Sequence, residues 1–138
     1  MANEAIIVEL LGNEGSGDPI RYTCADGTGI AKGALMVLTT PRTVITHAAH
    51  DTPFVGIAAA EKVASDGQTS IPVYTNGIFQ LVCKTGGTPC TIGDDVSLSS
   101  EVNAVELYDT LDNEKGYNVG KAMEDIAAAA TGMVRIHK

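Results

Sequence analysis

The stretch VGIAAAEKVASDGQTSIPVYTNGIF, residues 55–79, decides the fold. Two apolar segments flank Ser65-Asp66-Gly67, a run of turn-forming residues. The second segment leads into Asn76-Gly77, a dipeptide typical of the tight turn between two antiparallel strands. The stretch therefore predicts successive short strands joined by tight turns.

The same pattern of short apolar segments and glycine-bearing turns continues in both directions along the chain. Ile20, Tyr22 and Cys24 alternate with polar residues, as in a half-buried strand. Pro41-Arg42 predicts a turn, because proline fixes φ and cannot donate to a ladder. We expect an all-β fold, a small β-barrel or β-tulip-like domain. The expected strands are Ala5–Leu11, Ile20–Cys24, Ala34–Thr39, Thr43–His47, Val55–Ala60, Thr69–Tyr74, Ile78–Cys83, Asp95–Ser99, Asn103–Tyr108, Tyr117–Met123 and Gly132–His137.

Two segments predict short helical turns within this β-rich chain. Ala58–Ala64 contains good helix formers. Met123–Ala130 has acidic residues at its start and Gly132 just past its end, which suits one or two helical turns. We find no internal repeat and no second domain.

The N-terminus differs from the rest of the chain. A β-prone segment is followed by residues 12–19, GNEGSGDP, which have the composition of a flexible linker. We divide the chain into an N-terminal arm and linker, residues 1–18, and a β-barrel domain, residues 19–138. The segment is either the first strand of that barrel or an arm that pairs with a sheet edge of another protein. The candidate binding residues are Glu4, Ala5, Ile6, Ile7, Val8, Glu9, Leu10 and Leu11.

Composition limits the possible functions. A chain of 138 residues suits one domain, and with 4% aromatic residues and no Trp its core must be aliphatic. Such a core suits thin β layers better than a deep cofactor pocket, and we expect no cofactor. The net charge of −8, with Lys and Arg scattered along the chain, argues against nucleic-acid binding.

The apolar run Ala5–Leu11 is too short to span a bilayer, so we expect no membrane partner and synthesis in the cytosol. The three cysteines, Cys24, Cys83 and Cys90, are an odd number and argue against a disulfide framework. Cys83 and Cys90 flank a plausible hairpin loop, so a bridge between them is conceivable. Reduced, buried thiols are the favoured reading.

Two groups of residues could in principle support chemistry. His47 and His50-Asp51 have metal-ligand side chains, but they fall in a loop, and His137 is the only other histidine. We expect exposed loop histidines and no metal site. Lys121 invites comparison with the modified lysine of lipoyl or biotinyl carrier domains, but the tight-turn context is missing. A solvated strand lysine is the favoured reading.

The sequence gives no support for an enzyme. Nucleophile elbows, phosphate-binding glycine loops and paired cysteine motifs are absent from it. Acidic pairs such as Asp94-Asp95 and Glu124-Asp125 are adjacent, and neighbours on a strand point to opposite faces. We therefore expect no catalytic residues.

Several short motifs follow one another along the chain: Lys32–Met36, Val55–Ala58, Gln68–Ser70, Tyr74–Phe79, Gly120–Met123 and Ala130–Ile136. Taken in this order, they resemble the capsid decoration (cement) proteins of tailed bacteriophages, a family that includes the head-decoration protein of phage lambda. This chain is longer than the lambda protein, with extra residues between Ile57 and Gln68 and between Cys83 and Tyr117.

The resemblance implies a non-enzymatic virion protein. It implies a homotrimer on the outer surface of the expanded icosahedral head, made in the host cytoplasm, that clamps neighbouring major capsid protein subunits. The arm, Ala5–Leu11, would then pair with the capsid. Two other functions stay open: a small β-barrel carrier or ligand-binding module, and another virion part such as a head-fibre base.

Overall fold

The computed structural model describes residues 3–12, 18–49, 52–108 and 118–137. These residues form eleven strands and no helix, each strand within two residues of a predicted one. The strands are β1 (Ile6–Leu10), β2 (Ile20–Thr23), β3 (Leu35–Thr40), β4 (Thr43–Thr46), β5 (Phe54–Ala58), β6 (Ser70–Tyr74), β7 (Asn76–Cys83), β8 (Asp95–Leu98), β9 (Ala104–Leu107), β10 (Asn118–Ala122) and β11 (Thr131–His137).

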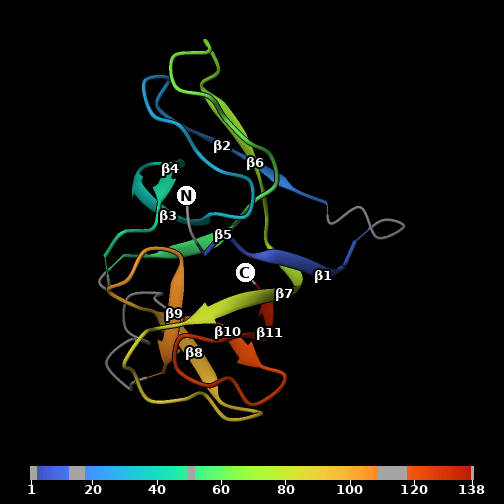
Figure 1. The fold of residues 1–138 in the computed structure, drawn as a ribbon. Coiled ribbons are helices and arrows are strands. Elements are labelled where there is room, and N and C mark those ends of the chain that lie inside the picture. Colours follow the sequence, from blue (N-terminus) through green and yellow to red (C-terminus); the bar gives the residue numbers. More distant parts are fainter. Residues whose placement is uncertain (1–2, 13–17, 50–51, 109–117, 138) are drawn as a thin grey trace.

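The all-β fold is confirmed, and it contains two small closed barrels (Figure 1). Barrel 1 has the strand order β2-β4-β3-β5-β6 and closes through the β2–β6 pair. Its single parallel contact joins β2 and β4, where Thr23 faces Thr43. Its interior is aliphatic, as the composition predicts. The buried residues are Cys24, Ile30, Ala34, Met36, Val44, Val55, Ala58, Ile71 and Val73.

Barrel 2 has the strand order β7-β11-β10-β8-β9 and closes through the β7–β9 pair. That pair is parallel, with Val82 opposite Ala104 and Cys83 opposite Val105, whereas the other pairs of the ring are antiparallel. Strand β1 lies outside the ring and pairs with β7 in antiparallel orientation. Barrel 2 therefore closes without β1.

Barrel 2 repeats barrel 1, which corrects our reading of the sequence as free of internal repeats. Strands β2 to β6 correspond in chain order to β7 to β11, with the same neighbours and the same single parallel pair. Each barrel also has one isolated antiparallel bridge, Ile30 to Lys62 in the first and Cys90 to Ile126 in the second. The predicted division of the chain at residue 18 stays a prediction.

Glycines occupy equivalent positions in the two barrels. Gly56 of β5 and Gly120 of β10 each lie where a β-carbon would collide with a backbone oxygen of the facing strand, that of Tyr74 or of Arg135. In both barrels a bulge precedes this glycine. The repeat is therefore visible in backbone constraints and hydrogen bonds, while most side chains differ.

The two predicted helical segments, Ala58–Ala64 and Met123–Ala130, are wrong. After β5 and β10 the chain stays extended, because Lys62 and Ile126 each exchange two backbone hydrogen bonds with the opposite loop, at 2.8 to 3.0 Å. Ser65 and Ala129 then turn the chain with φ of 61° and 64°. Tertiary pairing of these alanine-rich segments overrides their helix propensity.

Besides the interior of barrel 1, a second apolar core spans both barrels. Met36 points into barrel 1, whereas its neighbours Leu35 and Val37, together with Phe54 and Ile57, pack against the residues of barrel 2. The barrel 2 part of this core comprises Phe79, Leu81, Cys83, Cys90, Val96, Leu98, Val105, Val119, Ala122, Ile126, Val134 and Ile136.

Two buried polar contacts join the barrels at the same boundary. Leu35 N donates to Asn103 Oδ1 at 3.0 Å, and His47 Nε2 lies 2.7 Å from Ser99 O. The shared apolar core and these contacts fix one barrel against the other.

Asn76-Gly77 is not the predicted turn. Thr75 alone separates β6 from β7, and Asn76 and Gly77 already belong to β7. Figure 1 shows this segment leaving barrel 1 and entering barrel 2. The predicted turn at Pro41-Arg42 is confirmed, with Arg42 at φ 54°.

Candidate functional site

The predicted binding segment is a strand of the protein's own sheet. Within β1, Ile6 pairs with Gln80 and Leu10 with Gly77. Just before the strand, Ala5 N donates to Gly33 O at 2.7 Å. Of the flanking residues, Glu4 precedes this contact, and Leu11 follows the strand and is half-buried. The structure therefore shows this segment as an edge strand of the protein's own six-stranded sheet, outside the closed ring of barrel 2, and its pairing with another protein stays a prediction.

Two glycines allow β1 to lie this close. Gly33 has φ of +90°, and a β-carbon there would be 2.5 Å from Ala5 O. Gly77 has φ of +151°, and its β-carbon would be 2.7 Å from Glu9 O. One glycine belongs to each barrel, so both barrels contact the β1 segment. Its position follows from backbone approaches that other residues would obstruct.

The outer edge of β1 is the candidate binding surface, which we call the β1 edge (residues 6–10). Among the described residues β1 has a single strand neighbour, β7, so its other side faces outward without a ladder. Ile6, Ile7 and Val8 are 57%, 37% and 44% exposed. The register shifts between Ile7 and Glu9, which indicates a bulge at Val8. An edge of this kind can accept another strand.

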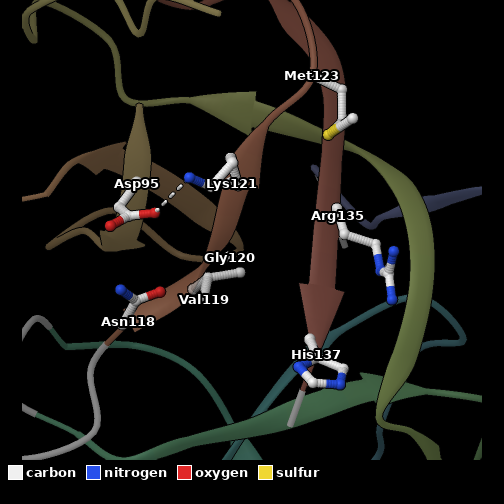
Figure 2. Close-up of a pocket in the computed structure, with 8 residues that line it drawn as sticks. All are labelled: Asp95, Asn118, Val119, Gly120, Lys121, Met123, Arg135 and His137. Atoms are coloured by element: carbon white, nitrogen blue, oxygen red, sulfur yellow. Dashed lines mark ion pairs between the residues drawn. The ribbon is translucent and has the colours of Figure 1, made fainter. Parts of the chain in front are cut away.

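A groove on the outside of barrel 2 is a second candidate. It encloses about 500 Å³ and runs over β8, β10 and β11. The lining residues are Asp95, Asn118, Val119, Gly120, Lys121, Met123, Arg135 and His137. Figure 2 shows Met123 and His137 at opposite ends of the groove, so its side chains do not converge on one point.

The charged groups of this groove contact polar neighbours. Lys121 Nζ lies 3.8 Å from Asp95 Oδ1, and both side chains are about half exposed, so the pair is weak (Figure 2). Arg135 Nη2 donates to Asn76 Oδ1 at 3.2 Å. Lys121 lies within β10, one residue before its end, and pairs with Arg135 of β11. The interpretation as a solvated strand lysine is confirmed, because Lys121 is exposed and lies in a strand.

Lys62 is a buried cation that the sequence analysis missed. Its ammonium donates to Asp26 O at 2.7 Å, Val63 O at 3.2 Å and Asp66 Oδ1 at 3.1 Å, with its side chain fully buried. The backbone N–H of Gln68, which donates to Asp66 Oδ1, lowers the pKa of that carboxyl, and Lys62 lowers it further. These three hydrogen bonds use all three N–H groups of the Lys62 ammonium, so we assign this lysine a structural role. Its equivalent in barrel 2 is the apolar Ile126.

The cysteines are free and buried, as the favoured reading predicts. Cys83 Sγ and Cys90 Sγ lie 3.9 Å apart. Burial raises the pKa of Cys90 to about 12, with a further contribution from Cys83, and burial also raises the pKa of Cys24. Protonated thiols in these positions are poor nucleophiles.

The histidines do not form a metal site in the part of the chain that the structure describes. His47 is fully buried, which contradicts the expected exposed loop histidine there, because its ring packs at the barrel boundary against Ser99 O. His50 and Asp51 lie outside the described residues. Among the residues that the structure describes, no group of three or more His, Cys, Asp or Glu side chains could hold a metal ion. Nor does any described segment form a helix with the length and hydropathy needed to span a membrane.

Comparison with known families identifies the family of this chain. The family model described as phage cement protein matches residues 15–137, nearly the whole chain. The chain belongs to the phage cement protein family. The search of curated proteins found no match.

The resemblance noted in the sequence is thus confirmed at the level of the family. A phage cement protein is a structural component of the virion that binds capsid proteins.

The match begins at residue 15, so it includes both barrels and excludes β1. Sequence reasoning located β1 but could not show its partner, because pairing with β7 depends on Gly33 and Gly77, which lie far from it in the chain. The groove was missed as well. Its lining residues come mainly from three strands, and the sequence drew attention to Asp95, Lys121 and His137 separately, without indicating that they lie along one groove.

Proposed function

We propose that this cement protein binds the outer surface of the expanded icosahedral head as a homotrimer and stabilises contacts between major capsid protein subunits. It acts mechanically, without a catalytic step, a cofactor or a metal. After synthesis in the host cytoplasm it joins the assembled shell. The observation that carries the proposal is the β1 edge, an exposed apolar strand edge on a protein of a capsid-binding family.

The capsid contact follows from the chemistry of an open strand. Backbone N–H and C=O groups along the β1 edge pair with an extended segment of the capsid protein, and Ile6 and Val8 cover apolar side chains of that segment. Glu4, Ala5, Ile7, Glu9, Leu10 and Leu11 complete the binding segment. Because Gly33 and Gly77 hold β1 in place, little conformational entropy is lost on binding.

Trimerisation strengthens a contact that is modest in one copy. Three linked β1 edges bind the same shell, so each contact raises the effective concentration of the next. The net charge of −8 keeps the protein away from packaged DNA and from anionic membranes, so neither is a partner.

The test compares the binding of variants to purified, expanded empty shells in a co-sedimentation assay. The double variant Ile6→Lys/Val8→Lys places two charges on the β1 edge, which opposes strand pairing. We expect at least tenfold weaker binding with an unchanged thermal midpoint. Ile92→Lys is the matched control, since Ile92 is 64% exposed and lies outside β1.

Equal binding of both variants and the unsubstituted protein would contradict the role of the β1 edge. An unsubstituted trimer that does not bind shells at all would contradict the capsid role, and would favour another virion part such as a head-fibre base.

A further inference from the structure

The internal repeat assigns each residue of β2 an equivalent in β7. In barrel 1, Ile20 faces Val73, and in barrel 2, Phe79 faces Val134. The closing hydrogen bonds agree, because Cys24 N donates to Thr69 O as Cys83 N donates to Ala130 O. The segment 19–21 of barrel 1 is therefore equivalent to the segment 78–80 of barrel 2.

These equivalent segments differ in what lies beside them. In barrel 2, β1 pairs with Ile78, Phe79 and Gln80 and covers that edge of β7. In barrel 1, β2 pairs with β4 only at Thr23, so within the described residues no strand lies beside segment 19–21, which we call the β2 edge. The side chain of Ile20 is 42% exposed, whereas that of its equivalent Phe79 is fully buried.

The backbone of the β2 edge points toward the open side. Arg21 faces Pro72 of β6, and Pro72 has no N–H and offers its oxygen to Ala59 N. Arg21 and Pro72 are therefore not hydrogen-bonded to each other, and the peptide groups of Arg21 face away from β6. The Arg21 oxygen instead accepts bonds from the side chain of Arg42, at 3.2 and 3.4 Å. The Arg42 side chain thus makes, at the Arg21 oxygen, the hydrogen bond that the N–H of a neighbouring strand would otherwise make.

The charge of this edge indicates the chemistry of its partner. Two of the nine Lys and Arg residues of an acidic chain, Arg21 and Arg42, meet here. Arg21 also donates to Ser70 Oγ at 3.0 Å, and both arginines are exposed. The segment that fills the equivalent edge of barrel 2 has the pattern Glu-Ala-Ile-Ile-Val-Glu, acidic at both ends and apolar between.

We propose that the β2 edge binds an extended acidic segment of the capsid protein as an added antiparallel strand, in the register that β1 adopts on β7. This inference rests on the proposed function. Each copy then holds two capsid segments, one at the β1 edge of barrel 2 and one at the β2 edge of barrel 1. A protein that joins two capsid subunits needs two such contacts, and the repeated barrel supplies them.

The test is hydrogen–deuterium exchange of the full-length protein, free and bound to expanded empty shells. We expect peptides that cover residues 19–23 and residues 6–10 both to gain protection on the shell. Protection of residues 6–10 alone would overturn this inference and leave the proposed function standing. If residues 19–23 are already protected in the free trimer, the β2 edge contacts a second copy of this chain, and this result would also overturn the inference. Absence of shell binding would contradict both.

A charge reversal gives an independent measurement. Arg21→Glu should weaken shell binding about tenfold, because an acidic partner is repelled and Arg21 is exposed enough for the fold to survive. Lys84→Glu makes the same change of charge outside the edge and should bind as the unsubstituted protein does. Equal binding of both variants, at equal thermal midpoints, would overturn the inference.

Discussion

At the residue scale, Gly77 controls the position of the candidate binding strand. A β-carbon at this position would lie 2.7 Å from Glu9 O, and its φ of +151° is one that other residues rarely adopt. Asn76-Gly77 reads in the sequence as a turn, yet this glycine serves a close approach between two strands. Local sequence cannot separate these two uses of glycine, because the second depends on a partner about 70 residues away.

Gly77→Ala should therefore destabilise the protein and loosen β1. We expect the free energy of unfolding to fall by about 1–3 kcal/mol. Exchange of the amides of residues 6–10 should also speed up. Chemical denaturation and hydrogen exchange measure the two effects.

Gly27→Ala is the control, because nothing lies within 4 Å of the β-carbon it adds. If both variants had the same stability and the same exchange in β1, the role assigned to Gly77 would be wrong.

Asp66 makes the stability of the protein depend on acid. The Gln68 N–H and Lys62 hold the pKa of this carboxyl below its ordinary value of 3.8. Its charged form is favoured in the folded state, so its contribution is complete above pH 3.8 and is lost as the pH falls through the lowered folded pKa.

The thermal midpoint should consequently fall as the pH is lowered below 3.8, and the fall should be shallower in Asp66→Asn. Asparagine keeps an acceptor for Gln68 but does not titrate. Scanning calorimetry across this range measures the slope, and parallel curves for the two proteins would refute the assignment to Asp66.

At the element scale, the strands were predictable and their partners were not. Short apolar segments, alternation and glycine turns located all eleven strands within two residues, because these signals are local in the sequence. The two helical turns failed because the bridges at Lys62 and Ile126 hold these alanine-rich segments extended. The repeat escaped notice because equivalent positions share backbone geometry and not chemistry, as Lys62 and Ile126 illustrate.

For the candidate site, too, the strand could be predicted from the sequence and its neighbours could not. The sequence identified residues 5–11 as a strand that either belongs to the barrel or pairs with another protein, and β1 pairs with β7 of its own sheet. Its outer edge is visible only in the sheet order. The exposed side of a strand can be predicted from alternation, but an edge without a neighbour depends on the whole topology.

Deletion of residues 2–11 tests β1 as an element. Because the β7–β9 pair closes barrel 2 without β1, we expect a folded trimer of lower thermal midpoint that no longer binds expanded shells. Circular dichroism, native mass and co-sedimentation measure the three properties. An unfolded product would show that the fold itself requires β1. A truncated trimer that binds shells as strongly as the full-length protein would show that β1 is not part of the interface.

At the scale of the whole molecule, two barrels form one mechanical unit. The side chains of Leu35, Val37, Phe54 and Ile57, on the outside of barrel 1, pack into the core that includes the residues of barrel 2. This apolar surface is therefore buried only when the two barrels are together. A protein that resists expansion of a shell benefits from this arrangement, because a load applied to one barrel reaches the other through packed side chains.

The shared core predicts a single unfolding transition despite the repeat. Phe54→Ala should lower the free energy of unfolding by about 3–5 kcal/mol, since Phe54 is 4% exposed and packs across the boundary. Calorimetry and denaturation followed by two probes should give one coincident transition for both proteins. Two separate transitions in the unsubstituted protein would show that the barrels fold independently.

The central claim is that this protein joins capsid subunits through exposed strand edges. Cryo-electron microscopy of expanded empty shells mixed with the purified protein tests it most directly. We predict added trimeric density on the outer surface, with a capsid strand running antiparallel along the β1 edge. Shells without added density, or bound protein whose β1 edge faces solvent, would contradict the claim.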